Sequence, residues 1–327
     1  MREMRKTKGA TLALASLLSC LVLSPMQSRA QTWPQRTVKF ILPLGPGSGV
    51  DIGARLFADR LAARWRQPVV VENRPGGDGI IAIMTFVNAR DDHTLLFAPS
   101  GTFTVHPFTH DKLPYDARDL VPIARVSNTV LGIAVPTSLR INSLAELIDL
   151  VRSKPDELNW APTSGLVDIV TSAFLKTASL NIAKVPYRDT VRGVNDLAEG
   201  RIQMYVAALA IIRSQMEAGN IKIVALTNRE RSPMAPDVPT AFEAGFPALT
   251  VEGLVGLFGP RDMSTDTREN IARDVLAIAA DRDIGARFAA TGQVVNVGTP
   301  AEFAASIEEQ RARVAAAAKD LGLKPAQ

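Results

Sequence analysis

Short β-type runs alternate with longer helical patterns through most of the chain. Apolar runs at 38–44, 69–72 and 94–98 predict strands, and the segments 51–66 and 79–88 between them have helical spacing. Strand–helix–strand units of this length connect parallel strands by right-handed crossovers. The pattern therefore predicts an α/β fold in which helices cover both faces of a parallel sheet.

The same alternation resumes in the second half of the chain. Further strands are predicted at 124–135, 158–161, 183–187, 202–207, 221–227, 249–258 and 293–297, and helices at 143–151, 167–180, 190–199, 210–218, 264–281 and 299–321. Two of these runs, 124–135 and 249–258, are longer than the rest and flank one complete α/β unit. They predict two crossing strands that join two lobes.

The expected fold is thus a two-lobed α/β fold with a hinge. Lobe one is predicted to contain 31–135, with 253–327 returning to it, and lobe two to contain 136–252. Ligands of open α/β sheets bind outside the carboxyl ends of the strands, and two such edges facing each other across a hinge form a cleft that closes.

The first thirty residues have the three parts of a secretory leader. A basic head precedes an apolar run at 11–24, and small residues, Ser28 and Ala30, stand where a signal peptidase cuts. Residues 1–30 are therefore predicted to be a signal peptide, and the protein to be periplasmic. The segment before Cys20 partly resembles a lipoprotein processing site, so lipid anchoring at Cys20 is the alternative.

Removing residues 1–30 changes the charge and the cysteine count. The whole chain has 37 Lys and Arg against 33 Asp and Glu, whereas residues 31–327 carry 32 of each and no cysteine. A neutral body creates no field that attracts nucleic acid. The absence of cysteine excludes disulfides, thiol catalysis and cysteine–metal sites.

The glycine-rich loop after the first strand is the first candidate binding segment. It opens a helix, whose free N–H groups and positive dipole end favour an anion. It matches neither the Walker A motif nor GxGxxG, so nucleotide binding has no motif here. The alternative is a plain turn with Asp51 as helix cap. The candidate residues are Leu44, Gly45, Gly47, Ser48, Gly49, Val50 and Asp51.

Four more loops follow predicted strands and place polar groups at the same kind of edge. Solvated connections are the alternative for each. The candidates in lobe one are Asn73, Gly76, Gly77, Ser100, Gly101 and Thr102; those in lobe two are Thr163, Ser164, Gly165, Tyr187, Arg188 and Asp189.

Catalytic and metal-binding patterns have little support. His93, His106 and His110 lie in one polar stretch, and Pro107 predicts that the last two histidines lie on a loop rather than one helix face. No GxSxG elbow is present, although a Ser/His/Asp set assembled in space stays open. We expect no catalytic residues, no cofactor and no metal.

Several segments together resemble a known family. They are PLGPGSGVDIGARLFADRLAARWRQPVVVENRPGGDG, TLLFA, KLPYDARDLVPIARV, VPY, DLAEGRIQMYVA, ALTNRERSPMAPDVPTAFEAGFP and GLFGP. Their order and spacing resemble the Bug-type substrate-binding proteins of tripartite tricarboxylate transporters over nearly all of residues 31–327. The resemblance implies a Venus-flytrap fold that captures a small carboxylated solute. It also implies that 44–51, 73–77 and 100–102 hold a carboxylate.

The chain departs from the family pattern mainly in lobe two. Asp189 and Arg192 replace a Gly and a Pro that the family often has, and Ala207 stands where an acidic residue is common. The missing acid argues against an amino-acid ligand, because a buried carboxylate would pair with its amine. Arg192 either faces a second ligand carboxylate or lies on the surface.

The sequence therefore predicts a non-enzymatic solute-binding protein that closes over a carboxylated molecule and delivers it to a membrane permease. It predicts no nucleic-acid partner and no stable membrane insertion. The alternatives are a binding protein that reports to a sensor kinase and an enzyme on a two-lobed α/β scaffold.

Overall fold

The computed structural model describes residues 33–163, 165–187 and 189–326. The chain divides into two units, Met1–Gln35 and Arg36–Gln327, and the second unit is the subject below. The predicted signal peptide, Cys20, Ser164 and Arg188 lie outside the described residues.

A six-stranded sheet forms the core of the first lobe, with the order β11-β4-β10-β3-β1-β2. The strand β1 pairs in parallel with β2 and with β3, whereas β10 runs antiparallel to both β3 and β4. The parallel part confirms the predicted crossovers. The strands are β1 (Val38–Leu42), β2 (Val69–Asn73), β3 (Thr94–Pro99), β4 (Val121–Thr129), β10 (Gly253–Gly259) and β11 (Gln293–Gly298), and the longer helices around them are α2 (Gly49–Trp65), α3 (Ile80–Ala89), α10 (Thr265–Ala279), α11 (Arg282–Ala290) and α12 (Pro300–Leu321).

A five-stranded sheet with the order β7-β6-β8-β5-β9 forms the core of the second lobe. The strand β6 pairs in parallel with β7 and β8, and β5 runs antiparallel to β8 and β9. Its strands are β5 (Leu131–Pro136), β6 (Asn159–Pro162), β7 (Ala183–Lys184), β8 (Met204–Ala208) and β9 (Ile221–Leu226), and its helices are α6 (Leu144–Ser153), α7 (Leu166–Thr177), α8 (Thr190–Ala198) and α9 (Leu209–Glu217). Ser143 caps α6 as predicted, because its hydroxyl accepts a hydrogen bond from the Glu146 N–H.

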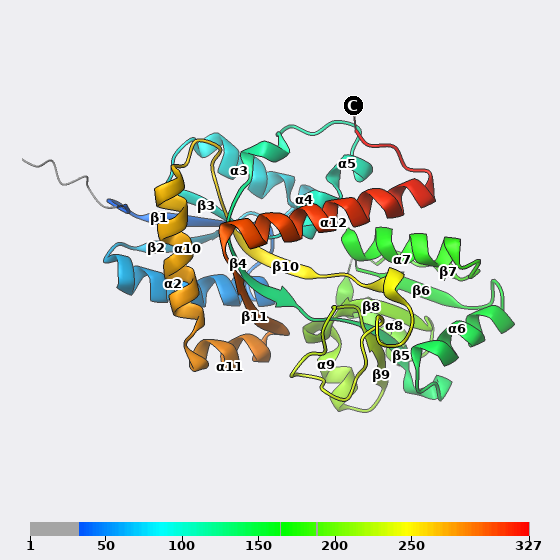
Figure 1. The fold of residues 1–327 in the computed structure, drawn as a ribbon. Coiled ribbons are helices and arrows are strands. Elements are labelled where there is room, and N and C mark those ends of the chain that lie inside the picture. The colour runs from blue at the N-terminus through cyan, green and yellow to red at the C-terminus, as the bar shows by residue number, and fades with distance from the viewer. Residues whose placement is uncertain (1–32, 164, 188, 327) are drawn as a thin grey trace, which may run out of the picture. The chain divides into compact units, whose positions relative to one another are not determined.

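The two long β-type runs cross between the sheets, as Figure 1 shows. The first run divides into β4, which ends at Thr129, and β5, which begins at Leu131 in the other sheet. The chain therefore changes sheet ahead of residue 135, the position expected from the sequence. Asn228 holds this crossing: its side chain donates to Thr129 O (3.0 Å) and accepts from the Leu131 N–H (2.9 Å).

Some elements differ from the sequence prediction. The run 249–258 begins with a 3-10 turn, Pro247–Leu249, before β10 starts at Gly253. The strand β7 has two residues rather than five, because only Ala183 and Lys184 pair with β6. The helix α11 was not predicted, because only Ile284 and Phe288 of its nine residues are buried and the apolar pattern is sparse.

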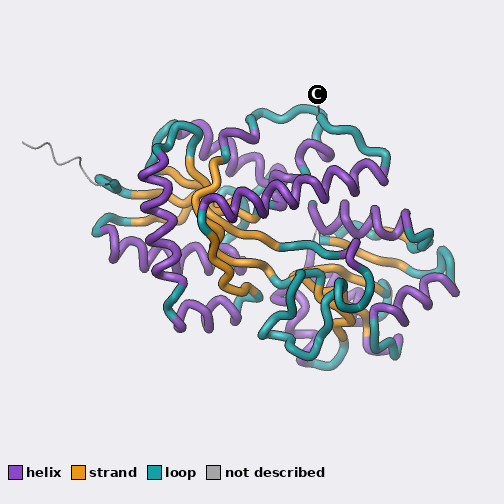
Figure 2. Tube along the Cα trace, in the orientation of Figure 1, coloured by secondary structure: helices purple, strands orange, loops and turns teal. Residues whose placement is uncertain are grey.

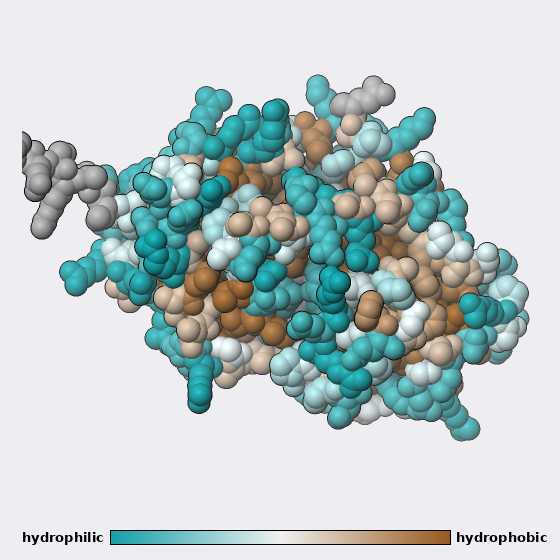
Figure 3. Space-filling model, in the orientation of Figure 1, coloured by the Kyte–Doolittle hydropathy of each residue, from teal (hydrophilic) through white to brown (hydrophobic). Residues whose placement is uncertain are grey.

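The C-terminal helix α12 contributes side chains to the cores of both lobes. Phe303 and Ile307 belong to the apolar cluster around β3 and β10, and Val314 belongs to the cluster around α6 and α7. Figures 1 and 2 show α12 lying across β4 and β10 and continuing above α7. In the face shown in Figure 3, the surface is mostly hydrophilic and broken by apolar patches. Within the described part of the chain, no helix has the length and apolar character needed to cross a bilayer.

Gly256 in the middle of β10 provides a test of this packing. A Cβ at this position would lie 2.4 Å from Ala124 O and 2.5 Å from the Phe303 ring. We expect Gly256→Ala to lower the free energy of unfolding by about 1–3 kcal/mol, measured by urea denaturation. The matched control is Gly285→Ala in α11, where a Cβ meets no atom within 4 Å; it should raise the free energy of unfolding by about 0.5–1 kcal/mol. Equal effects of the two substitutions would contradict the packing at Gly256.

Candidate functional site

The glycine-rich loop before α2 is fixed by a buried carboxylate. Ser48 caps α2 by accepting from the Asp51 N–H (3.2 Å), and Asp51 Oδ2 accepts from the Gly47 N–H (2.9 Å). Asp51 is only 2% exposed. Its carboxylate therefore provides the negative charge that the N-terminus of α2 favours.

Asn73 and Arg55 complete this arrangement. Asn73 Nδ2 donates to Asp51 Oδ1 (2.8 Å) and to Leu44 O (2.9 Å), and Arg55 Nη2 donates to Asp51 Oδ1 (2.9 Å). Burial by itself raises the pKa of the Asp51 carboxyl, but hydrogen bonds from Arg55, Gly47 and Asn73 outweigh it and hold the pKa below its ordinary value of 3.8. Asp51 and Asn73 thus shape the loop, and neither lines the cavity described next.

A cavity of about 670 Å³ lies between the carboxyl ends of strands of the two sheets, and we name it the cleft cavity. Loops after β1, β2 and β3 form one side, and the start of α7 forms the other. Residues of the two segments that cross between the sheets, 129–131 and 252–254, also line it. Its lining residues are Pro43, Leu44, Gly76, Gly77, Asp78, Gly79, Pro99, Gly101, Thr102, Val105, His106, Thr109, Thr129, Leu131, Gly165, Leu166, Val167, Glu252, Gly253 and Leu254.

Two helices, one from each lobe, begin at the cleft cavity with a glycine cap. Gly79 caps α3 and Gly165 caps α7, and neither provides a side-chain hydrogen bond to the helix. The first N–H groups of a helix have no acceptor within it. In α3 the Ile80 N–H donates to Gly77 O of the preceding 3-10 turn, so the N–H groups that follow it are the ones open to a ligand. Gly76, Gly77, Asp78 and Gly79 all have positive φ, which folds the backbone tightly ahead of α3.

Among the described residues, the side chains that line the cleft cavity supply hydroxyls and carboxylates but no lysine or arginine. Asp78 and Glu252 are the lining carboxylates. Glu252 is engaged: its carboxylate accepts from Asn128 Nδ2 and from the Arg229 N–H, each at 2.6 Å. Within the described part of the chain, the positive potential available to an anion here comes from backbone N–H groups and helix dipoles.

His106 supports the backbone that carries these N–H groups. The side chain is fully buried, and its Nε2 lies 3.0 Å from Asp78 O. A carbonyl only accepts, so Nε2 carries the proton and Nδ1 accepts from Tyr115 Oη at 2.6 Å. Burial lowers the pKa of His106 below its ordinary value of 6.5, which keeps the ring neutral at pH 7.

The loop expected around His106 and His110 is instead helical. His106–Thr109 forms one turn of helix (α5), with Pro107 tolerated in its first turn, and the rings of His106 and His110 lie 4.9 Å apart. In the described residues, one group has the geometry of a possible metal site, Asp91 with Asp92 and His93. Asp91 accepts from the N–H groups of His93 and Thr94 at 2.8 Å and so closes a turn.

The structure brings six of the predicted site residues together around the cleft cavity and leaves others outside it. Those that line it are Leu44, Gly76, Gly77, Gly101, Thr102 and Gly165. Gly45, Gly47, Gly49 and Val50 belong to the loop and first turn of α2 and do not line it. Ser100 is fully buried and donates to Gln310 Oε1 (2.7 Å), and Thr163 donates to Val206 O.

The other lobe-two candidates that the structure describes do not line the cleft cavity. Tyr187 Oη donates to Asp196 Oδ2 (2.7 Å), and Asp189 caps α8. Arg192 is exposed on α8, and Ala207 is fully buried in β8 opposite Gly132. A ligand role for these four residues stays a prediction.

Several lining residues were missed by the sequence reasoning. Thr129, Leu131 and Gly253 stand where the chain crosses between sheets, and the two long β-type runs carried the signal that could have found them. Asp78 and Gly79 directly continue a loop already selected. No sequence pattern indicated that His106 lines the cavity, because its position is set by contacts with Tyr115 and with the Asp78 carbonyl.

Comparison with known proteins agrees with this geometry. Residues 53–297 match the model of the tripartite tricarboxylate transporter family receptor. The chain belongs to this family. It is 30% identical over 319 residues to a UPF0065 protein of Bordetella bronchiseptica, covering 96% of this chain and 94% of that protein.

Solved structures show the same two-lobed fold. Rpa4515 of R. palustris, solved with adipate, is 28% identical with a TM-score of 0.77, covering 90% of this chain and 99% of that one. MatC of Rhodopseudomonas palustris, solved with bound malate, is 25% identical with a TM-score of 0.72, covering 88% and 100%. The predicted fold and the predicted family of solute-binding proteins are thereby confirmed.

The hydrogen-bonded carboxylate of Asp51 predicts that the free energy of unfolding of this family member depends on pH. A carboxyl with a lowered pKa in the folded state stabilises the protein above its unfolded pKa, and this contribution is lost as the pH falls through the folded pKa. Asp51→Asn should therefore lower the free energy of unfolding by about 2 kcal/mol at pH 7, with the difference from the native protein shrinking below about pH 4. Urea unfolding at several pH values measures it.

The control is Asp59→Asn, which changes an exposed aspartate of the same helix. It should alter the free energy of unfolding by less than about 0.5 kcal/mol. If Asp51→Asn gave an equally small, pH-independent change, the buried cluster would not stabilise the loop.

Proposed function

We propose that this protein captures a small carboxylated solute in the periplasm and delivers it to a membrane permease. The observation that carries the proposal is that α3 and α7 both begin at the cleft cavity after a glycine, which provides no capping side chain. A carboxylate between them would accept hydrogen bonds from backbone N–H groups of both lobes. The adipate and malate found in related structures support this ligand class.

The cleft cavity has the size and surface for such a molecule. Its volume lies within the range of about 300–1,000 Å³ that is usual for small-molecule sites. Apolar side chains of Leu131, Leu166 and Val167 would contact the carbon chain of the solute. Thr102 has a hydroxyl with no partner among the described residues, so it can donate to a ligand oxygen.

Closure of the two lobes over a ligand is expected, because residues of both lobes line the cleft cavity. Gly101 from lobe one packs so near Leu166 of lobe two that a Cβ on Gly101 would lie 3.3 Å from the Leu166 Cβ. A ligand that touches both sides binds the closed arrangement better than any open one and shifts the population towards it. The closed form is then the form that a permease recognises.

The residues that line the cleft cavity favour binding of a ligand without its chemical conversion. The only histidine that lines the cleft cavity in the described chain, His106, has both ring nitrogens engaged by Tyr115 and Asp78. Glu252 is held by two donors. Neither group is in the state that a general acid or base requires, so we propose that the ligand is released unchanged.

A charge placed in the cleft cavity tests the ligand class. Thr102→Asp would put a carboxylate beside the bound anion, whereas Thr102→Asn has the same shape without the charge. We expect Thr102→Asp to bind adipate or malate at least tenfold more weakly than Thr102→Asn, about 1.4 kcal/mol, by isothermal titration calorimetry. Equal affinities of the two variants, or preferential binding of neutral diamides, would contradict an anion site.

Export is tested separately on the leader. Expressed in a Gram-negative host, the protein should be recovered from the periplasm with an N-terminus that begins at Gln31. Cys20→Ala should leave this processing unchanged, as measured by mass spectrometry. A diacylated N-terminus at residue 20, lost in Cys20→Ala, would instead establish the lipoprotein alternative.

A further inference from the structure

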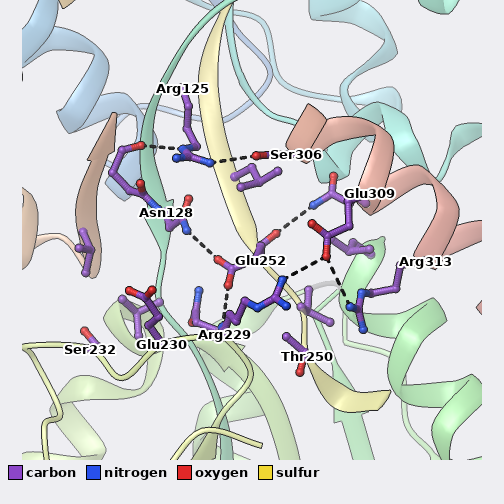
Figure 4. A pocket seen from close by; sticks show the side chains of 18 of the residues that line it. Arg125, Asn128, Arg229, Glu230, Ser232, Thr250, Glu252, Ser306, Glu309 and Arg313 are labelled. Carbon is purple, nitrogen blue, oxygen red and sulfur yellow. Dashed lines mark hydrogen bonds and ion pairs between the residues drawn. The ribbon is translucent and has the colours of Figure 1, made fainter. Parts of the chain in front are cut away.

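The two crossing segments also border a second cavity, which shares Leu166, Glu252 and Leu254 with the cleft cavity. Thr129 and Leu131 line the cleft cavity, whereas Asn128 and Val130 line this one, because successive side chains of a strand point to opposite faces. Its other walls come from β10, β11, α12 and the loop 228–232 that follows β9 (Figure 4). We name this space of about 500 Å³ the hinge cavity.

A β-bulge brings an arginine onto the same wall as Asn128. Ser127 pairs with Val255 and Arg125 with the next residue, Gly256, so Val126 is the extra residue in β4. A bulge shifts the alternation of the strand by one position. Arg125 consequently shares a face with Asn128 although the two are three residues apart, and Figure 4 shows both side chains along the cavity.

Arg125 differs from the other arginines of the hinge cavity in having only neutral hydrogen-bond partners, although its charge also helps to lower the pKa of the Glu302 carboxyl. Its Nε donates to Asn296 O and its Nη1 to Ser306 Oγ, each at 2.9 Å. Among the described residues, no carboxylate lies within ion-pair distance of it. The cavity's other arginines have such partners: Arg229 and Arg313 meet Glu309, and Arg231 meets Glu243. The Arg125 guanidinium therefore retains N–H groups and a positive charge for an added anion.

Two polar atoms of the hinge cavity have no hydrogen-bond partner among the described residues. They are Asn128 Oδ1 and Thr250 Oγ1, both buried, in residues that are 9% and 7% exposed. Asn128 Nδ2 already donates to Glu252, which leaves Oδ1 as an acceptor that needs a donor. Buried polar groups of native proteins are nearly always satisfied, so unpaired ones require an occupant.

We propose that the hinge cavity is a second binding site, for a small carboxylate that carries its own hydroxyl donor. The carboxylate of this ligand pairs with Arg125, and its hydroxyl donates to Asn128 Oδ1, with Thr250 Oγ1 completing the site. Arg125 and Asn128 belong to β4 of the six-stranded sheet and Thr250 precedes β10, so the proposed contacts lie where the chain crosses between the sheets. The loop 228–232, which follows β9 of the other sheet, lines the same cavity.

The experiment separates the two sites by blocking one of them. In Thr102→Asp the cleft cavity carries an anion-repelling charge, so hydroxycarboxylate binding that persists in it and depends on Arg125 occurs in the hinge cavity. We titrate glycolate, L-lactate and L-malate into this variant by isothermal titration calorimetry. We expect one equivalent of at least one of these acids to bind. Adding Arg125→Met should weaken this binding at least tenfold, whereas the control Arg152→Met, an exposed arginine on α6, should not change it.

Thr250→Val provides a second readout that does not depend on removing a charge. It should weaken binding to the Thr102→Asp variant at least fivefold while raising the melting temperature, because it removes an unpaired hydroxyl. The proposal is overturned if the Thr102→Asp variant binds none of the three acids, or if its binding is indifferent to Arg125→Met and Thr250→Val. A crystal structure with water alone on Asn128 Oδ1 and Thr250 Oγ1 at saturating acid also overturns it. Failure of the cleft proposal would appear differently, as native affinity retained in Thr102→Asp when Arg125→Met is also present.

Discussion

The first N–H groups of a helix have no acceptor within that helix, and this constraint organises the cleft cavity. The helices α3 and α7 begin there from opposite lobes, each after a glycine that provides no capping side chain. By contrast, α2 satisfies its own N-terminus with Ser48 and Asp51. An anion is therefore favoured at the two helix starts that lack a cap and not at the one that already has a carboxylate.

The segments that cross between the two sheets link ligand binding in the cleft cavity to movement of the lobes. Asn228 joins the last residue of β4 to the first of β5 through two hydrogen bonds, so the change of sheet is held at a defined point. The side chains before and after that point line one cavity on each face. A ligand in the cleft cavity would contact both lobes, and thermodynamic linkage requires any coupling between the two cavities to be reciprocal.

Much of the fold could be predicted from the sequence because apolar runs and glycine turns recur at α/β spacing. The parallel strands β1, β2 and β3 lie where their patterns placed them. The division between β4 and β5 at Val130 could not be predicted, because the apolar pattern continues through it while the pairing partners change. The helix α11 was not predicted, because two buried residues in nine do not give a clear helical periodicity of apolar positions.

The site could be predicted only in part, because the sequence does not show which polar side chains bond to one another in the folded protein. Gly76, Gly77, Gly101 and Gly165 were selected as backbone-rich loop positions, and these line the cleft cavity. Asp51 and Asn73 were selected for the same reason, but they bond to one another. Loop composition does not distinguish residues that face a ligand from residues that shape the loop, since both need polar atoms near a strand end.

The central claim is that backbone N–H groups at the starts of α3 and α7 hold a carboxylate. A crystal structure of the protein with bound adipate or malate tests it most directly. The account predicts carboxylate oxygens within about 3 Å of N–H groups in the first turn of α3, of α7, or of both. A ligand carboxylate held by lysine or arginine side chains, with both helix starts in contact only with solvent, would contradict it.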